Sequence, residues 1–385
     1  MLESLDKMYS NSKDRCTLMC KNKPLISFTL YGDSLTTDEI KVINEYFIKV
    51  ENLSSIISDR ISIVNRFGLK DLLSSIGLSS KIEILKFTQG ISLSDCLWLK
   101  FESSNSVWED INPYVKNHSF DLECLLESST KLKTVFPNYS INGNYPKCWK
   151  TSEEGIHQLI KCGTPYPWNS GLEPLGDILT EQVCDMIGFK DYIKYNEIFI
   201  DYDFKESWLL KETLKEHKGR LGSICNNFTN ENLSLISAKD LGLRTYKECI
   251  DFSRQNNLDT LKIGYTLLFD CITFNEDRHM GNLGFLYNPD SMNFIDVAPM
   301  YDNNLAFLPY WDDRVDLLEY AKEAKARDGS SFIELYKFVL QEFPELIFKI
   351  PSFNLKCHII KSDRIGRLNY ILNWNLDRLN NIIVR

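Results

Sequence analysis

The chain has 385 residues, of which 43% are apolar and 25% charged, and it carries a net charge of -9 with a pI near 5.3. These proportions match folded globular proteins and argue against disorder, while the length favours two or three lobes with separate cores. The acidic balance argues against a nucleic-acid surface, because phosphate binding needs clustered Lys and Arg, so we expect no direct nucleic-acid binding.

Cysteine usage and hydropathy indicate the cellular compartment. The eleven cysteines are scattered without metal-ligand spacing, and no signal peptide is recognisable. Together these features predict reduced thiols and a cytoplasmic protein. No apolar run reaches the roughly 18 residues that a spanning helix needs, so we expect no membrane association.

Residues 1–135 are expected to form an accessory domain that is mainly helical. Within it, residues 25–31 alternate like a short strand. Ser80 is placed to cap a helix at residues 81–88, which Gly90 ends.

Two tryptophans, Trp98 and Trp108, stand among polar residues near the end of this domain. Their surroundings suggest no catalytic chemistry. Tryptophans of this kind most often anchor packing while their N–H groups find a partner, so we interpret both as packing anchors. A substrate-docking role is the alternative.

The composition shifts to turn formers at residues 140–147, SINGNYPK, where a nucleotide-binding lobe at residues 136–228 is expected to begin. Two strands follow, at residues 148–150 and 157–161. Gly143 allows the loop before them to bring backbone N–H groups close to a phosphate, although one glycine is a weak signal by itself.

Lys161 ends the second strand, from which a lysine can reach nucleotide phosphates. The alternative is an exposed lysine at a strand end. A partner carboxylate is expected on the helix at residues 177–187, and Glu181 is the choice, with Glu173 as competitor. Glu181 lies nearly opposite the apolar stripe, which fits either a residue facing a ligand or a solvated one.

The segment at residues 223–228 is interpreted as the connector between two lobes. Asn226 and Phe228 would line a nucleotide-base pocket there without chemistry of their own. Beyond it, Asp259 precedes a strongly apolar helix at residues 263–272 that leads into a polar loop.

That loop, residues 275–282, reads NEDRHMGN and offers Asp277 and, five residues later, Asn282. Phosphoryl transfer uses such a pair, because the aspartate accepts the hydroxyl proton and the asparagine carbonyl supplies a hard oxygen to magnesium. Residues 294–297 then form an apolar strand. Asp302 follows it, where a second metal ligand is expected.

These segments resemble the HipA-like serine/threonine kinases, whose catalytic loop has the form D-x-H-x-x-N and whose metal-binding loop resembles A-P-x-Y-D. Phosphoinositide kinases share a related D-R-H-x-x-N loop. The resemblance is clear over residues 140–310. It implies that Asp277 is the catalytic base and that Asn282 and Asp302 bind Mg²⁺.

The resemblance extends to the residues that hold ATP. It implies that Lys161 is a catalytic residue on the phosphates and that Glu181, as the family's helix glutamate, faces the nucleotide as its partner. Ser140 lies in a segment resembling the S-[IV]-x-G-x-x-x-K loop that these kinases autophosphorylate, which implies a regulatory phosphate that lowers ATP affinity. A plain turn serine is the alternative.

Four neighbours of the motif are assigned supporting roles. His279 is expected to brace the loop by hydrogen bonding, and Asp270 and Asp296 are taken as structural carboxylates. Asn304 stands where relatives often carry glycine. Asparagine tolerates positive φ well, so the turn is expected to survive there.

We therefore expect an α+β, bilobal protein-kinase-like fold, in which a small antiparallel sheet at residues 136–228 is followed by a mainly helical lobe at residues 229–385. The expected activity is ATP- and Mg²⁺-dependent phosphorylation of serine or threonine in a protein. The resemblance also implies a toxin-type kinase with an antitoxin-like partner. A pseudokinase or nucleotide-binding partner module, a lipid kinase and an adenylyl transferase are the alternatives. The lack of a polybasic segment argues against a lipid kinase. The complete set of catalytic residue types argues against a pseudokinase.

Overall fold

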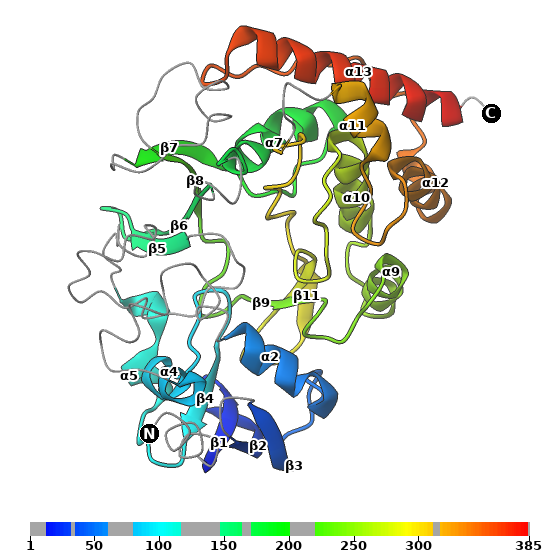
Figure 1. Ribbon diagram of the computed structural model, residues 1–385. Coiled ribbons are helices and arrows are strands. Elements are labelled where there is room, and N and C mark those ends of the chain that lie inside the picture. Colours follow the sequence, from blue (N-terminus) through cyan, green and yellow to red (C-terminus); the bar gives the residue numbers. More distant parts are fainter. Residues whose placement is uncertain are drawn as a thin grey trace, which may run out of the picture. The chain divides into compact units, whose positions relative to one another are not determined.

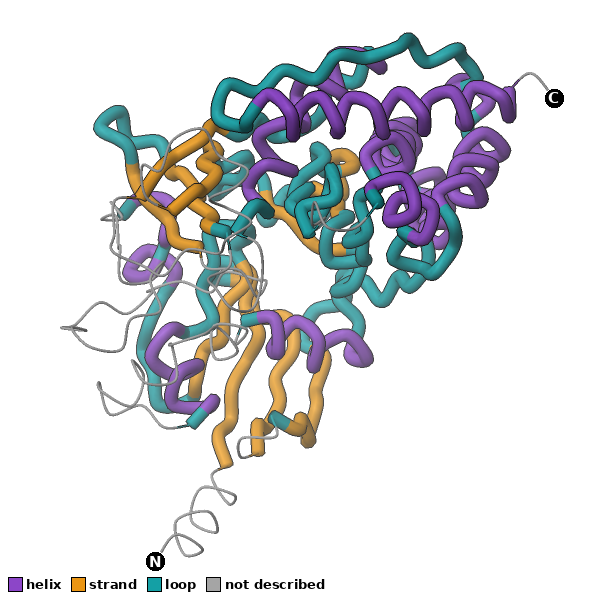
Figure 2. Tube along the Cα trace, turned by 45° about the horizontal axis from the view of Figure 1, so that its top comes forward, coloured by secondary structure: helices purple, strands orange, loops and turns teal. Residues whose placement is uncertain are grey.

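The computed structural model combines helices with three small sheets (Figures 1 and 2), so the predicted α+β class is confirmed. It describes residues 13–31, 35–60, 80–116, 147–163, 171–200, 220–310 and 316–383. No helix in these ranges is both long and apolar enough to cross a membrane.

The chain forms two compact units, each assembled from separated segments. Unit 1 consists of Met1–Leu159, Asn227–Leu243 and Phe285–Ile295, and unit 2 of Ile160–Asn226, Arg244–Gly284 and Asp296–Arg385. These units do not coincide with the predicted divisions after residues 135 and 228. The three-domain division stays a prediction.

Unit 1 is built on a four-stranded sheet of order β3-β2-β1-β4 with antiparallel neighbours. Its strands are β1 (Lys13–Cys20), β2 (Lys23–Tyr31), β3 (Thr36–Val42) and β4 (Leu97–Phe101), accompanied by η1 (Val50–Asn52), α2 (Leu53–Asp59), α4 (Lys81–Thr88), α5 (Trp108–Ile111) and η3 (Pro113–Val115). A second sheet, of order β11-β10-β9, contains β9 (Ser234–Ser237), β10 (Gly284–Tyr287) and β11 (Phe294–Val297).

The prediction that the N-terminal part is mainly helical is wrong for its described residues, in which strands form the framework. In β1, Cys16, Leu18 and Cys20 are buried at every second position, but this alternation begins after a charged run. β4 pairs with β1 from about 80 residues further along the chain. Long-range pairing of this kind overrides local propensity.

Two local predictions in unit 1 are confirmed. Helix α4 begins after Ser80, whose side chain accepts from the Glu83 backbone N–H in a capping box, as the sequence indicated. Trp98 and Trp108 are both buried, and Trp98 Nε1 donates to the Lys21 carbonyl at 2.7 Å. They anchor packing.

The third sheet has the order β5-β6-β8-β7, with strands β5 (Lys147–Thr151), β6 (His157–Cys162), β7 (Asn196–Ile200) and β8 (Arg220–Asn226). The division between the two units falls within β6. In unit 2, α7 (Pro174–Ile187) follows β6 in sequence and packs against β8. Pro174 is at its first position, and Gly188 ends it in the left-handed conformation.

The remainder of unit 2 is helical. It contains α9 (Tyr246–Gln255), α10 (Leu261–Thr273), α11 (Leu317–Glu323), α12 (Phe332–Glu342), η4 (Pro344–Leu346) and α13 (Ser362–Ile383). Helix α10 packs against α12 and α13 (Figure 1), which explains why it is apolar almost all round. Asn375 of α13 donates to the Cys271 and Ile272 carbonyls near the end of α10. The polar loop that follows α10 therefore starts from a rigid support.

Candidate active site

Lys161 of β6 is the centre of a buried charge cluster within unit 2. Its Nζ lies 2.6 Å from Asp177 Oδ2 and 3.0 Å from Asp302 Oδ1, and the ring of Tyr195 packs beneath it at 4.6 Å from the ring centroid. The side chains of Lys161 and Asp177 are only 6% and 1% exposed. The alternative of an exposed lysine at a strand end is therefore wrong.

The charge state of Lys161 follows from this pairing. Burial alone would lower the pKa of the ammonium group, but the Asp177 and Asp302 carboxylates raise the pKa well above its ordinary value. Lys161 is thus a fixed cation with two carboxylates around it. A group of this kind can exchange one carboxylate for a phosphate oxygen without changing its charge.

Asp177 reaches Lys161 from the first turn of α7, and it is held by two further bonds. Its Oδ2 accepts from Ser223 of β8 at 3.0 Å, and its Oδ1 accepts from the Asn303 backbone N–H at 2.9 Å. Close approach of helix and loop makes this geometry available, because a Cβ at Gly176 would lie 2.1 Å from the Asn303 carbonyl oxygen. Glycine is required there.

Asp302 adopts the left-handed conformation with φ 56°. This conformation is uncommon for residues with a side chain, and such outliers concentrate at functional sites. The expected positive φ at Asn304 is not observed, because the turn reverses two residues earlier. Aspartate tolerates the left-handed region better than most residues, which explains how Asp302 can occupy the turn.

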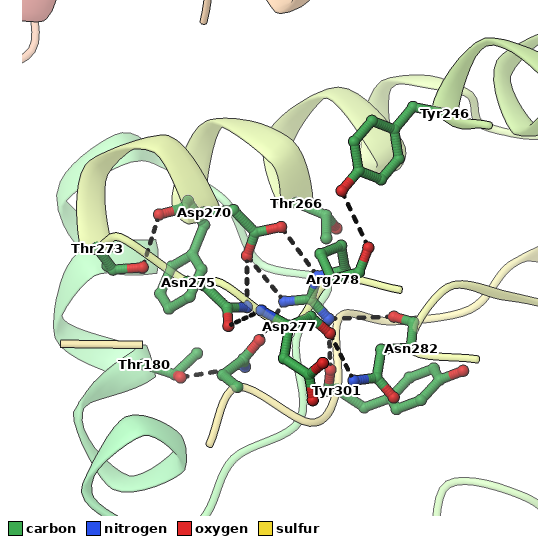
Figure 3. Close-up of polar contacts among 12 residues, drawn as sticks. Thr180, Tyr246, Thr266, Asp270, Thr273, Asn275, Asp277, Arg278, Asn282 and Tyr301 are labelled. Atoms are coloured by element: carbon green, nitrogen blue, oxygen red, sulfur yellow. Dashed lines mark hydrogen bonds and ion pairs between the residues drawn. The ribbon is translucent and has the colours of Figure 1, made fainter. Parts of the chain in front are cut away.

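The polar loop after α10 is organised by a buried ion pair (Figure 3). Arg278 Nε and Nη2 donate to the two carboxylate oxygens of Asp270, both at 3.0 Å, and both side chains are 1% exposed. Asn275 Nδ2 also donates to Asp270 Oδ1 at 2.7 Å. Asp270 is therefore structural, as predicted.

Arg278 also joins this loop to the Asp302 turn. Its Nη1 donates to the Asn282 carbonyl at 3.1 Å and to the Tyr301 carbonyl at 2.7 Å (Figure 3), and its Nη2 donates to Asn303 Oδ1. One guanidinium group thereby sets the spacing between the segments that carry Asn282 and Asp302. The five donors of arginine in a rigid fork suit this task.

Asp277 lies on the partly exposed side of the same loop. Its backbone carbonyl accepts from Asn282 Nδ2 at 2.9 Å, which leaves the side-chain oxygen of Asn282, Oδ1, as the atom able to bind a metal. The Asp277 side chain is 19% exposed. Burial, with a smaller contribution from Asp302, raises the pKa of this carboxyl, while His279 and Arg327 oppose the shift.

The chain matches no protein-family model and no curated protein sequence. Among solved structures it is similar to the proinflammatory kinase CtkA of Helicobacter pylori, with 13% identity and a TM-score of 0.43 over 63% of this chain and 92% of CtkA. It is also similar to HipA of Shewanella oneidensis MR-1 in complex with HipB and operator DNA, with 12% identity and a TM-score of 0.47 over 95% and 99% of the chains. The Golgi casein kinase with Mn and ADP bound follows at 11% identity and a TM-score of 0.30, over 62% and 71%.

Solved structures of HipA and CtkA are thus among the neighbours of this chain. All three TM-scores lie below 0.5. The function proposed below therefore rests on the geometry of the site.

The predicted pairing of Lys161 with Glu181 is wrong. Glu181 forms its ion pair with Lys194, at a position where both side chains are largely exposed, while Lys161 pairs with Asp177. At about 100° per residue Glu181 is only about 40° from Asp177 around α7, but it is one turn further along the helix. One helical turn is enough to change which carboxylate meets the lysine.

The other predicted site residues are placed as follows. Asn226 is the last residue of β8 and Phe228 comes two residues after it, where the chain passes from unit 2 to unit 1. Ser140 and Gly143 lie outside the described residues. The roles of all four stay predictions.

Two supporting assignments are consistent with the contacts. His279 Nδ1 accepts from the Gly281 backbone N–H at 2.9 Å, so the ring braces the loop as expected. Asp296 accepts from Lys262 Nζ at 2.7 Å and from the Asp259 backbone N–H at 3.1 Å, which is a structural use of that carboxylate.

Asp177 is the main residue that the sequence analysis missed. A signal was present, because Asp177, Thr180 and Cys184 recur at helical spacing and form a second buried face of α7 beside the apolar stripe. An acidic residue on a buried face needs a cationic or hydrogen-bonding partner, and Lys161 of the preceding strand was available.

Asn282 and Asp302 suit a magnesium nucleotide. Within the described ranges, no group of three or more His, Cys, Asp or Glu side chains is arranged to hold a metal ion. Mg²⁺ commonly takes one or two protein carboxylates and completes its shell with water and phosphate oxygens. A carboxylate and an amide oxygen, held at a fixed spacing by Arg278, fit that pattern.

Proposed function

We propose that this chain is an ATP- and Mg²⁺-dependent protein kinase that phosphorylates serine or threonine. The observation that carries the proposal is the Arg278 network, which holds Asp277 and Asn282 of one loop beside Asp302 of another. A proton acceptor and two metal-binding oxygens on one rigid frame are what phosphoryl transfer requires, because its catalysis consists mainly of positioning and electrostatic stabilisation.

The residues of the proposed nucleotide site act before any bond changes. Lys161 releases Asp302 and binds phosphate oxygens, while Asp177 continues to hold the lysine in place. Asp302 and the side-chain oxygen of Asn282 would hold the metal. When bound, Mg²⁺ neutralises charge that develops on the phosphates.

Asp277 acts on the acceptor. Its partly exposed carboxylate accepts the proton of the incoming hydroxyl, and its backbone is fixed by the bond from Asn282. The oxygen of that hydroxyl forms the new bond to the γ-phosphorus as the bond from phosphorus to the bridging oxygen of ADP breaks. The raised pKa of Asp277 makes it a stronger proton acceptor than an exposed aspartate.

Labelled ATP tests the reaction class. The purified protein, with Mg²⁺ and a pool of serine- and threonine-containing peptides, should transfer label from γ-labelled ATP to itself or to peptide and none from α-labelled ATP. Transfer of the α-label would mean adenylyl transfer. Nucleotide binding without transfer of either label would favour a pseudokinase, and γ-transfer to phosphoinositide vesicles alone would favour a lipid kinase.

Asp177→Asn should lower kcat/KM for ATP about ten-fold or more, because Lys161 loses its shortest ionic contact and its orientation. Glu181→Gln should stay within about two-fold of wild type, since its ion pair with Lys194 is exposed. Steady-state kinetics at varied ATP, with the melting temperature as a folding check, makes the comparison. A fall in kcat/KM for Glu181→Gln, with none for Asp177→Asn, would instead favour Glu181 as the functional partner of Lys161.

Ser140 is proposed as the regulatory phosphorylation site, on the strength of its loop sequence. A phosphate adds about -1.5 to -2 charges near the anionic nucleotide, so it should lower ATP affinity. Mass spectrometry after incubation with Mg²⁺ and ATP should find the phosphate on Ser140. Full activity in a homogeneously Ser140-phosphorylated sample would contradict an inhibitory role of this phosphate.

The remaining proposals concern location and partners. The ten cysteines in the described residues form no disulfide with one another, which suits the proposed reducing cytoplasm. An antitoxin-like partner and a toxin role are proposed from the motif resemblance. The absence of direct nucleic-acid binding stays a prediction from net charge.

A further inference from the structure

An arginine faces the proposed catalytic base from outside the catalytic loop. Arg327 Nη1 lies 3.5 Å from Asp277 Oδ1, and its side chain is 58% exposed. At this separation, and with the guanidinium group largely in solvent, the ion pair is weak. Arg327 can therefore exchange Asp277 for another anion at small cost.

Arg327 lies in a short turn, residues 324–331, which is held by hydrogen bonds within the turn. Its ends are joined by a bridge between Lys325 and Ser331, and the Ala326 N–H donates to the Ser330 carbonyl at 2.9 Å. Asp328 Oδ1 accepts from the Ser330 hydroxyl at 2.6 Å and from its N–H at 2.9 Å. The carboxylate of Asp328 is thus used within the turn.

The turn is attached to the catalytic loop and presents its cations outward. Burial raises the pKa of Glu276, the neighbour of Asp277, and the nearby backbone of Lys325 opposes this shift. Ala324 and Ala326 are buried whereas Lys325 and Arg327 are exposed, so the two cationic side chains alternate with two small buried ones. Lys325 and Arg327 thus form a fixed basic edge beside Asp277, the proposed proton acceptor. The chain as a whole is acidic, with a net charge of -9.

We propose that the 324–331 turn selects the substrate, and that Arg327 binds a carboxylate or phosphate that lies next to the hydroxyl to be phosphorylated. This proposal rests on the proposed kinase function. The acceptor hydroxyl must come within about 2.6–3.2 Å of Asp277. An anion bound to Arg327 is then a few ångströms from that hydroxyl. Neighbouring residues of a peptide have this separation, since their Cα atoms are about 3.8 Å apart.

Arginine suits this role better than lysine. Its planar guanidinium group is always charged and binds carboxylate or phosphate oxygens in pairs. In the absence of substrate the same group faces Asp277. When substrate binds, its anion would replace Asp277 as the partner of Arg327, and its hydroxyl would donate to Asp277 in place of Arg327. Arg327 would then keep an anionic partner, and Asp277 a hydrogen-bond donor.

Matched peptides test the selectivity. Each contains one serine flanked by Glu, by Gln or by phosphoserine, so that carboxylate and phosphate recognition are measured separately. Wild type should have a kcat/KM about ten-fold or more higher for an anionic peptide than for the Gln peptide. Arg327→Gln should remove the preference, and Arg327→Glu should reverse it in favour of Lys-flanked serine.

Lys322→Gln provides the matched control, since Lys322 is an exposed cation on α11 that pairs with Glu319. It should keep the acidic preference. If wild type phosphorylated both anionic peptides no faster than the Gln-flanked peptide, or if Arg327→Gln kept the preference, the proposal would be overturned.

A binding assay separates this proposal from the kinase function. If wild type transfers no phosphate to any peptide, fluorescence anisotropy with the same labelled peptides still reports on the surface. Tighter binding of the Glu or phosphoserine peptide, lost in Arg327→Gln and kept in Lys322→Gln, would support the basic edge. Equal binding of all peptides would overturn it.

Discussion

Asp277→Asn should slow γ-phosphoryl transfer about 10²–10⁴-fold, the usual contribution of a general base. The change keeps the size and the backbone bond from Asn282 to the Asp277 carbonyl, but it removes the proton acceptor. Initial rates with γ-labelled ATP measure the effect. Because a side chain that is 19% exposed is altered without loss of volume, the melting temperature should change little.

Asp296→Asn is the matched control, because Asp296 is the competing carboxylate shortly before the turn at Asp302 and pairs with Lys262. It should retain transfer within about two-fold. Transfer by Asp277→Asn at the wild-type rate would refute the assignment of the loop. A structure with magnesium nucleotide in which Asp296 binds the metal and Asp302 is remote would refute the metal ligands.

Arg278→Met should destabilise the protein by about 3–5 kcal/mol, since it leaves the carboxylate of Asp270 buried without its cation. The same change removes the donors to the Asn282 and Tyr301 carbonyls (Figure 3). Unfolding in urea, followed by circular dichroism, measures the loss. Phosphoryl transfer should fall as well in whatever fraction stays folded, because the spacing between the two loops is no longer held.

The double variant Asp270→Leu with Arg278→Met distinguishes the buried charge from the other contacts. It should recover part of the lost stability, since no unpaired charge remains, while the two loop carbonyls still lack their donors. Arg254→Met is the exposed counterpart, because Arg254 forms an ion pair with Glu342 at the surface of unit 2. It should cost less than about 1 kcal/mol. Equal losses of stability in Arg254→Met and Arg278→Met would show that the buried network stabilises the protein no more than an exposed ion pair does.

Local features were predictable because neighbours along the chain decide them. The capping box at Ser80 involves residues three positions apart, and the helix before the catalytic loop follows from its apolar pattern and from Asp259, whose Oδ1 accepts from the Leu261 N–H. The bracing role of His279 is likewise a contact over two residues. Such interactions depend on the backbone conformation of one segment.

Sheet formation in unit 1 was not predictable in the same way. The strand β1 begins with charged residues and pairs with β4 about 80 residues later, so its stability comes from a partner that no local pattern identifies. A four-stranded sheet satisfies both backbone hydrogen bonding and apolar burial. The expectation of helices there gave local propensity more weight than it has.

By itself, the sequence determined the two loops on which Asp277, Asn282 and Asp302 lie and the side chains that these loops offer, because loop motifs are contiguous and their spacing is covalent. Only the tertiary structure decided that Asp177 rather than Glu181 meets Lys161, and that Arg278 joins both loops. It also brought Arg327 to the base from about 50 residues away. The physical reason is that a buried charge must find its partner in three dimensions: a displacement of one helical turn, about 5.4 Å, is invisible in a motif yet decides which charges pair.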